Sequence, residues 1–311
     1  MGGLRVMRCI ILLIIVGVAL VPAAFGQSSS ANPITGMGYL YPPVAVAPGQ
    51  LISVFLAGNV PGDIGATVQG LSAPVLEARP ASGCTAGAIC SGVTAITIQI
   101  PYELQPGCSF TTPVCNVLLL TQLVVTAGGV AGPPIDLTPI SDQVHILTAC
   151  DTVVPSGSGI APADGLPCAP LITHANGSLV TAGNLAQAGE ELVAYAVGLG
   201  LTVPSIPTGQ AATVATPTQE PFRLDFNFRP NALATQPMPL ILEPGSSSPD
   251  LNSPLYSGLV PGYAGLYQVN FIVPQLPAGV QPCSGLEQTN LTVSVGGQMS
   301  FDGAGICVAA P

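Results

Sequence analysis

Apolar and polar residues alternate with a two-residue period in several short stretches of the chain. In residues 94–100 every second position is apolar, namely Ile96, Ile98 and Ile100. Residues 222–229 alternate in the same way, with Phe222, Leu224, Phe226 and Phe228 facing one way and Arg223, Asp225, Asn227 and Arg229 facing the other. Because successive side chains of a strand point to opposite faces, this pattern predicts half-buried β-strands.

Turn residues separate these stretches. The 311 residues include 37 glycines and 33 prolines, which occupy nearly every gap between the predicted strands. Both residue types favour turns because glycine tolerates positive φ and proline has a fixed φ. The best helical candidate, 184–196, contains Gly189 and runs into residues that favour strands, so we predict a turn followed by a strand there.

Three strand-forming blocks occur twice in the same order. Residues 47–55 correspond to 187–195, each a turn glycine followed by a strand. The strand that ends at Pro101 corresponds to the one that ends at Pro274, with Val269, Phe271 and Val273 in place of Ile96, Ile98 and Ile100. The third block has Leu123, Val125 and Ala127 before Gly128-Gly129 in one copy, and Leu291, Val293 and Val295 before Gly296-Gly297 in the other.

Each copy has the size and the pattern of about seven short strands that characterise an immunoglobulin-like sandwich. We therefore predict an all-β protein with two tandem immunoglobulin-like β-sandwich domains, at 45–149 and 170–311, after a cleaved signal peptide and an N-terminal extension at 27–44. The second copy is longer, and we place its insertion near 205–253. The stretch 150–169 is rich in Ser, Gly, Pro and Ala and is predicted to be a linker closed by its own disulfide.

Residues 1–26 have the three parts of a secretory signal peptide. Arg5 and Arg8 precede an uncharged apolar run at 10–21, and small residues follow at 23–26. The apolar run is shorter than the roughly 20 residues that span a bilayer. We predict cleavage after Gly26 and a protein that is secreted or associated with the cell envelope, in the periplasm or at the cell surface.

Eight of the nine cysteines follow the signal peptide, and an even number in an exported chain indicates disulfides. They fall into four close pairs: Cys84 with Cys90, Cys108 with Cys115, Cys150 with Cys168, and Cys283 with Cys307. Zinc is the competing interpretation. There is no C-x-x-C pair, which the common zinc spacings would need, so we expect no metal site.

Charge is scarce. Charged residues are 6% of the chain, against roughly 25% in an ordinary soluble domain. The five basic residues are all arginines, and two of them lie in the signal peptide. The chain has 15 acidic residues in comparison. A surface so poor in cations cannot neutralise phosphates, which excludes nucleic acid as a partner.

Few residues could carry catalysis. His145 lies on an alternating strand, where it is expected to point outward, and His174 precedes an Asn-Gly turn, where it is expected to be solvated. Glu190 and Glu191 are adjacent, but neighbours on a strand point to opposite faces, so they do not form an acid pair. The chain contains no G-x-S-x-G motif. We predict no enzyme, no catalytic residue and no cofactor, and a hydrolase whose carboxylates are assembled by the fold is the least favoured alternative.

Two surfaces are candidates for binding. One is a glycine-rich loop with the aromatic and polar side chains Tyr256, Tyr263, Tyr267 and Gln268, although Tyr267 shares the parity of the apolar residues Val269 and Phe271, which indicates a core position. The other is the polar face formed by Arg223, Asp225, Asn227 and Arg229, which is otherwise explained as a solvent-facing row of alternating charge.

Several blocks resemble an uncharacterised extracellular domain family that is abundant in Acidobacteria, notably Solibacter, and often lies at the C-terminus of large exported proteins. The blocks are Ala47-Pro48-Gly49-Gln50, Gln99 to Leu104, Asn176-Gly177-Ser178, Ala196 to Gly200, and Tyr256 to Gly262 running on to Gly265 through Asn270. The resemblance covers 46–308 and implies compartment and architecture, with no established activity. The first copy keeps Tyr102 and Glu103 after the strand-ending proline, whereas the second has Gln275 and Leu276.

These observations together predict an exported, non-catalytic structural or adhesive module of the bacterial cell envelope or extracellular space. The alternative is a protein that binds carbohydrate or a cell-wall polymer through the loop at 256–267. The sequence names no partner, and extracellular proteins and polysaccharide are the candidate classes.

Overall fold

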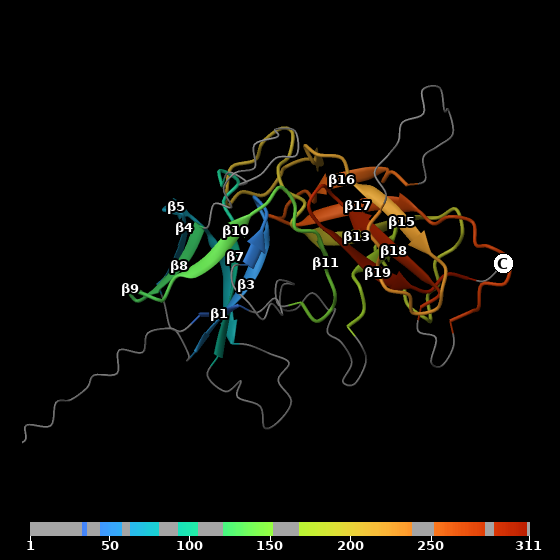
Figure 1. Ribbon diagram of the computed structural model, residues 1–311, viewed down its shortest axis with the longest axis horizontal. Helices are drawn as coiled ribbons and strands as arrows, with labels where there is room; N and C mark the ends of the chain where they lie inside the picture. The colour runs from blue at the N-terminus through green and yellow to red at the C-terminus, as the bar shows by residue number, and fades with distance from the viewer. Residues whose placement is uncertain are drawn as a thin grey trace, which may run out of the picture.

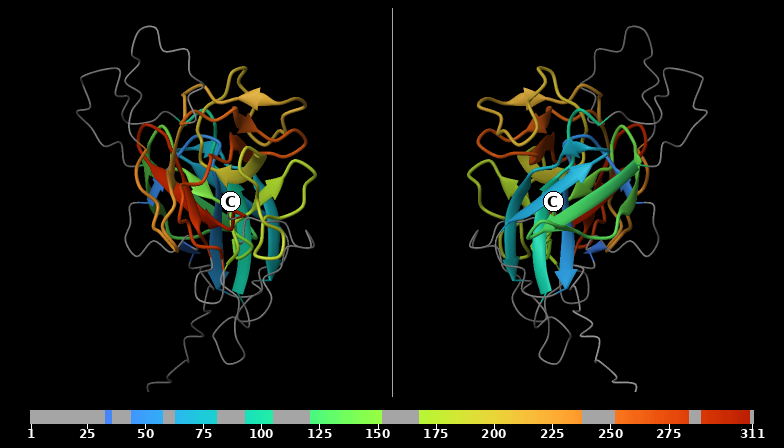
Figure 2. Two further views of the ribbon diagram at one scale, coloured as in Figure 1. Left: turned by 90° about the vertical axis from the view of Figure 1, so that its right-hand side faces the viewer. Right: turned by 90° about the vertical axis from the view of Figure 1, so that its left-hand side faces the viewer.

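The computed structural model describes residues 33–35, 44–57, 63–80, 93–104, 121–151, 168–237, 252–283 and 289–309. Over these residues the protein is all-β, and none of them forms a helix that could cross a membrane. Two β-sandwiches lie end to end along the long axis (Figure 1), so that a view down this axis places one behind the other (Figure 2). The predicted signal peptide, 1–26, lies outside the described residues.

The first sandwich pairs two sheets. One has the strand order β1 (Pro33–Thr35), β3 (Leu51–Ala57), β7 (Val93–Gln99) and β6 (Val75–Pro80). The other has the order β2 (Val44–Val46), β10 (Ile135–Pro139), β8 (Thr121–Ala127), β4 (Ile64–Val68) and β5 (Leu71–Ser72), with β9 (Val130–Ala131) beside β8. All pairs are antiparallel except β2 with β10. This is the strand order of an immunoglobulin-like sandwich, whose sheets are labelled ABED and CFG.

The second sandwich repeats this topology. One sheet has the order β11 (His145–Ile146), β13 (Glu191–Val197), β17 (Tyr267–Ile272), β16 (Tyr256–Leu259) and β14 (Thr216–Pro217), and β12 (Ile172–His174) lies beside β11 on the same edge of β13. The facing sheet has β15 (Arg223–Asn227), β18 (Leu291–Gly296) and β19 (Phe301–Ile306). A parallel bridge between Ala186 and Val308 takes the place of the β2–β10 pair.

The repeated sequence blocks occupy equivalent strands and form equivalent hydrogen bonds. The turn glycine Gly49 donates its N–H to Ile100 O at 2.9 Å, and Gly189 donates to Val273 O at 2.8 Å. The residue after each glycine, Gln50 or Glu190, accepts a hydrogen bond on its side chain from the backbone N–H three residues earlier. The internal repeat predicted from the sequence is therefore a repeat of structure.

The predicted alternation matches the burial of the strands, with one difference. Phe222 and Leu224 are buried, and Phe226 and Phe228 pack against the core of the second sandwich. In β7, however, both faces are buried, so that Gln99 is fully covered as well as the isoleucines. This strand lies between β3 and β6, and its end is covered by the second sandwich, whose Gly209 donates its N–H to Gln99 Oε1.

The connection between the sandwiches is the segment 140–144. His145 and Ile146, assigned to the first domain by the sequence analysis, pair with Val197 and Ala196 of β13 in the second. The predicted linker at 150–169 accordingly falls between β11 and β12 in the chain, and its residues 152–167 lie outside the described residues. The predicted insertion at 205–253 contains the strands β14 and β15.

Two of the four predicted disulfides are confirmed. Cys150 is bonded to Cys168, and Cys283 to Cys307, with Cα–Cα distances of 5.3 and 5.9 Å. The first link is exposed on both sides, whereas Cys307 is buried. The predicted pairs Cys84 with Cys90 and Cys108 with Cys115 lie outside the described residues.

Replacing Cys283 and Cys307 together by serine is expected to lower the free energy of unfolding of the second sandwich by about 3 kcal/mol, because the link closes a loop with a sequence separation of 24. Urea unfolding followed by circular dichroism measures the change, and non-reducing peptide mapping verifies the link in the parent protein. Unfolding curves that coincide for parent and variant would contradict the prediction.

Candidate functional site at the joint between the domains

The end of the first sandwich packs against the loops of the second. Its contact surface is formed by the turn 47–50 and the loop 99–104, which belong to two of the repeated blocks. On the second sandwich the contact residues follow β13, precede β17, or lie at 208–209. Four of these five regions, all but 208–209, contain residues of the sequence blocks described above, so these blocks converge on one joint.

Tyr102 is the central residue of the joint. It comes from the first sandwich, but its side chain is buried and belongs to the hydrophobic core of the second. Its hydroxyl lies 3.3 Å from that of Tyr267, which begins β17 and is fully buried. Because Tyr267 donates its proton to Gly200 O at 2.5 Å, Tyr102 is the donor in the pair. Burial raises the pKa of both phenols, so both stay neutral at physiological pH.

Glycines make room for this contact. Gly49 has φ +75°, and a Cβ at this position would lie 2.0 Å from the ring of Tyr102. Gly198 and Gly200 follow β13 with φ of +79° and +80°, and Cβ atoms there would lie 1.9 and 2.3 Å from carbonyl oxygens of the connecting segment. Any side chain at these positions would push the connecting segment or Tyr102 away from the second sandwich.

Polar contacts complete the joint. Thr208 Oγ1 of the second sandwich accepts a hydrogen bond from Tyr102 N at 2.9 Å and donates one to Glu103 Oε2 at 2.6 Å. A small apolar cluster adds to them, in which Leu51 of the first sandwich is buried with Leu147, Leu171 and Val197 of the second. The two domains are thus joined by a mixed apolar and hydrogen-bonded surface.

The connecting segment is itself held by the hairpin between β18 and β19. Asp142 is buried and accepts hydrogen bonds from the backbone N–H groups of Gln298, Met299 and Ser300. The Ser300 hydroxyl donates to Asp142 and accepts from Val144 N at 2.7 Å. The segment therefore lies alongside the hairpin, fixed by bonds between side chains and backbone.

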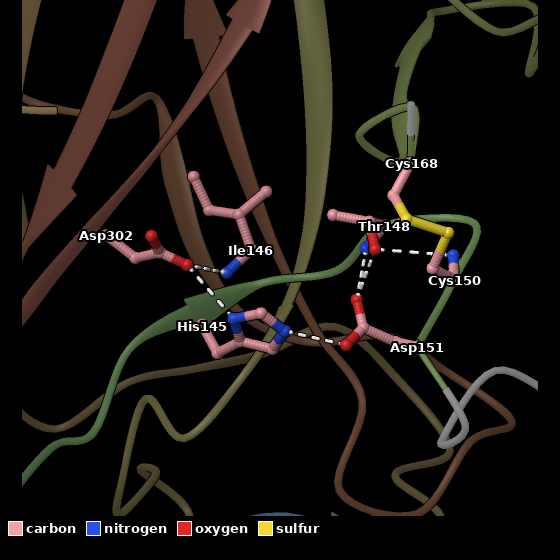
Figure 3. A network of polar contacts seen from close by, with 7 residues as sticks. All are labelled: His145, Ile146, Thr148, Cys150, Asp151, Cys168 and Asp302. Atoms are coloured by element: carbon pink, nitrogen blue, oxygen red, sulfur yellow. Dashed lines mark hydrogen bonds and ion pairs between the residues drawn. A yellow bond between two sulfur atoms is a disulfide. The ribbon is translucent and has the colours of Figure 1, made fainter. Parts of the chain in front are cut away.

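His145 continues this arrangement as the centre of a bridge (Figure 3). Its Nδ1 lies 3.1 Å from Asp302 Oδ2 on β19, and its Nε2 lies 3.0 Å from Asp151 Oδ1. Asp302 Oδ2 also accepts the N–H of Ile146 at 2.9 Å. Asp151 Oδ2 accepts both the N–H and the hydroxyl of Thr148, at 2.6 and 2.7 Å. The bridge thus links β11, β19 and the turn that leads to Cys150.

The electrostatics of the bridge favour a charged imidazole. Burial alone would lower the pKa of His145, but the hydrogen bonds and the negative charges of Asp151 and Asp302 outweigh it and raise the pKa to about 9. Burial alone would raise the pKa of Asp151, but its bonds to His145 and Thr148 leave that pKa below its ordinary value. At neutral pH both ring nitrogens are therefore protonated and donate to carboxylates.

The structure does not gather the predicted binding loop into one aromatic surface. Tyr267 is fully buried in the joint, in the core position that its parity predicted. Tyr256 is half-buried and donates its hydroxyl proton to Leu259 O, and Gln268 is half-buried and donates to Asn270 Oδ1. Tyr263 is 54% exposed. In the pairing of β16 with β17, Tyr256 lies opposite Asn270 and Gln268 lies opposite Gly258, whereas Tyr263 belongs to the turn between the strands.

The predicted polar face is brought together, but it does not face solvent as a row. Arg223 and Asp225 are half-buried, and residues 231–237 fold back across the face of the sheet that carries Asp225. Arg223 Nη1 donates to Ser253 Oγ at 2.8 Å, and Asp225 accepts the hydroxyl of Thr235 at 2.5 Å. Beyond the end of β15 the exposed Arg229 lines an open groove of about 660 Å³ together with Asn227, Phe228 and Gln281.

His174 differs from its expected position, and three aspartates were missed. His174 is buried on β12, and its Nδ1 lies 2.5 Å from Glu190 Oε1, because the turn 187–190 folds back toward this strand. The roles of Asp142 and Asp302 carry no local sequence signal, since they bind groups more than 150 positions away, whereas Asp151 binds Thr148 and His145, three and six positions before it. Among the described residues, no three His, Cys, Asp or Glu side chains are grouped so as to hold a metal ion.

Comparison with known proteins identifies neither a matching family model nor a matching curated protein. Among solved structures, the chain is similar to the Yersinia pseudotuberculosis adhesin InvE, with 10% identity over 86% of this chain and a TM-score of 0.19. It spans 57% of that adhesin chain. It is also similar to the tandem Ig repeats of Dlar, with 11% identity over 90% of this chain and 98% of that one, and a TM-score of 0.19. The fold assignment rests on the strand order of the chain itself.

Replacing Gly49 by alanine is expected to open the joint, because the new Cβ would collide with Tyr102 in a backbone conformation that disfavours side chains. The matched control is Gly70→Ala, which has φ +78° but no atom within 4 Å of its Cβ. Electron–electron distances between spin labels at Val130 and Leu233, both exposed, report the arrangement of the sandwiches. We expect one narrow distance for the parent and for G70A and a broad distribution for G49A. Equal distributions for all three proteins would contradict the prediction.

The bridge at His145 predicts a loss of stability in mild alkali. Protonated His145 stabilises the folded state. This contribution to the free energy of unfolding is fully present below the ordinary histidine pKa of about 6.5, and it is lost as the pH rises through about 9. Between pH 6.5 and 9.5 the free energy of unfolding of the parent should fall by about 2 to 3 kcal/mol more than that of His145→Gln. Urea unfolding across this range measures the difference, and parallel pH profiles would refute the assignment.

Proposed function

We propose that this protein is an exported, non-catalytic structural or adhesive module that presents two immunoglobulin-like sandwiches in one fixed arrangement outside the cytoplasm. The observation that carries the proposal is the joint, where Tyr102 of one sandwich is buried in the core of the other. Because Tyr102 completes the core of the second sandwich, separating the two domains would also destabilise that core.

The joint supports a rigid unit because the connection between the domains is short and is held by both hydrogen bonds and close packing. Domains in one chain move relative to each other unless their interface is large and apolar. Here the connection has five residues, from the end of β10 to the start of β11. Its Asp142 is held by the hairpin at 297–300, and its carbonyls lie against Gly198 and Gly200. A fixed spacing between two surfaces is what a structural or adhesive module requires.

The disulfides support an oxidising compartment. Cys150 and Cys168 are both exposed, and a link of this kind persists outside the cytoplasm, where thiols are not kept reduced. The pattern of residues 1–26 and the resemblance to extracellular acidobacterial domains support the same location. We therefore place the protein at the cell envelope or in the extracellular space.

A second candidate function, binding of carbohydrate or cell-wall polymer, is favoured by the groove at the far end of the second sandwich. The exposed guanidinium of Arg229 and the amides of Asn227 and Gln281 line it, next to the ring of Phe228. This set offers hydrogen-bond donors and an apolar surface, as sugar recognition requires. The groove replaces the tyrosine loop as the candidate surface, since Tyr267 is enclosed in the joint.

The proposal predicts that beads coated with the mature chain, residues 27–311, bind to bacterial cells or isolated cell-envelope material and that reduced, heat-unfolded chain does not. Flow-chamber retention measures the adhesion. Arg229→Gln tests the groove, with Arg79→Gln as the matched control because Arg79 lies on the first sandwich beside Glu77. Loss of retention with R229Q alone assigns adhesion to the groove. Retention equal to that of uncoated beads on every surface would refute an adhesive role.

A further inference from the structure

We propose that the bridge Asp151–His145–Asp302, together with the Cys150–Cys168 disulfide, is a mechanical lock that holds the first strand of the second sandwich, β11, against its last strand, β19. The inference rests on the proposed structural role, because it assigns the contacts by which the second sandwich would withstand tension between the joint and its far end.

The backbone attaches β11 on one side only. Its ladder with β13 consists of two residue pairs, His145 with Val197 and Ile146 with Ala196, flanked by bonds from Gln143 N to Gly198 O and from Leu147 N to Tyr195 O. On its other side it lies next to β19, but the two strands form no backbone ladder. Side chains take the place of that ladder, since Asp302 accepts from both Ile146 N and His145 Nδ1. The bonds to one carboxylate therefore close this edge of the sandwich.

The direction of the two strands determines how tension would act. Asp142 and Val144 contact Ser300, and Ile146 contacts Asp302, so the residue numbers rise together along the two segments. Both strands therefore run away from the joint, and the chain leaves at the far end of the second sandwich (Figure 1). Pulling the two ends apart would slide β11 along β19 in shear. In this geometry the bonds at Asp142, Ser300 and Asp302 bear the load together rather than one after another.

The second carboxylate fixes the histidine from the opposite side. Asp151 binds His145 Nε2 and is itself held by the N–H and the hydroxyl of Thr148 (Figure 3). With a carboxylate on each ring nitrogen, the imidazole cannot rotate away from Asp302 without breaking a second charged bond. Charge-assisted hydrogen bonds of this kind are about twice as strong as neutral ones.

The disulfide gives the lock a second attachment. Cys150 directly precedes Asp151, and its partner Cys168 lies shortly before β12, which pairs with β13 through Ile172 and Ala194. Between them, Ala149 N donates to Ala169 O and Leu171 N donates to Leu147 O. A pull on β11 is thus transmitted through the disulfide to β12, and the residues between the two cysteines cannot be drawn out while the link is intact.

Single-molecule force spectroscopy at constant force tests the lock on the mature chain with handles at both ends. His145→Gln should raise the rate at which the second sandwich opens about tenfold or more, the effect of losing roughly 1.4 kcal/mol or more. The matched control is His174→Gln, which removes a histidine–carboxylate pair on the same sheet edge that does not reach β19. We expect H174Q to change the rate less than about twofold. Equal rates for H145Q and the parent, or equal increases in both variants, would overturn the proposal.

A second measurement tests the disulfide. In a Cys150→Ser, Cys168→Ser double variant, β11 should leave in a separate early step that adds about 6 nm before the sandwich opens, since a separation of 18 residues at roughly 3.5 Å each becomes available. The parent should open without this step. A double variant that opens in one step would remove the disulfide from the lock. The opening rate is measured without any ligand, so the lock can fail while the coated beads still bind, and bead binding can fail while the opening rates behave as expected.

Discussion

The burial of Tyr102 in the core of the second sandwich is the contact on which the arrangement of the protein depends. This burial requires Gly49 on one side of the ring, because a Cβ at that position would overlap the ring atoms. On the other side it requires Tyr267, whose hydroxyl oxygen accepts a hydrogen bond from the Tyr102 hydroxyl. In the second copy of the repeat, Gln275 follows the strand-ending proline in place of Tyr102, and its side chain lies near the turn glycine Gly189. The two copies of the repeat thus differ at the residue that is central to the joint, so the equivalent turns have the same backbone bonds but different neighbours.

Some of the few charged residues lie on the edge strands of the sheets. Sheets guard their free edges with charged side chains, prolines and irregular pairing. The edge strand β6 carries Glu77 and Arg79, 3.8 Å apart, together with a bulge and Pro80, and the edge strand β15 carries Arg223 and Asp225. Other edges, such as β2, β5 and β14, are only two or three residues long. The remaining charges of the bridge at His145 close the edge between β11 and β19. These edges thus carry charge, a bulge or proline, or are short, in a chain that has no lysine.

Much of the fold followed from local pattern, because a two-residue period, turn glycines and repeated blocks depend on neighbouring residues. The equivalence of Gly49 with Gly189 and of Ile100 with Val273 was visible in the sequence and is matched by identical hydrogen bonds. The core position of Tyr267 and the pairing of Cys150 with Cys168 and of Cys283 with Cys307 were equally predictable from parity and proximity. The connection at 140–144 was not, since nothing near His145 indicates that its two-residue strand pairs with Val197.

The strand content, the tandem repeat and the disulfides Cys150–Cys168 and Cys283–Cys307 could therefore be read from the chain alone, because they depend on composition or on short spacings. Tertiary contacts, in contrast, bring the turn 47–50 and the loop 99–104 against the second sandwich, bond Asp225 to Thr235 of the segment 231–237, and place His145 between two aspartates that keep it charged. These features arise where segments far apart in the chain approach each other, and the energy of such contacts depends on burial and distance that no local pattern encodes. The joint and the bridge are of this kind, and they carry the proposed function.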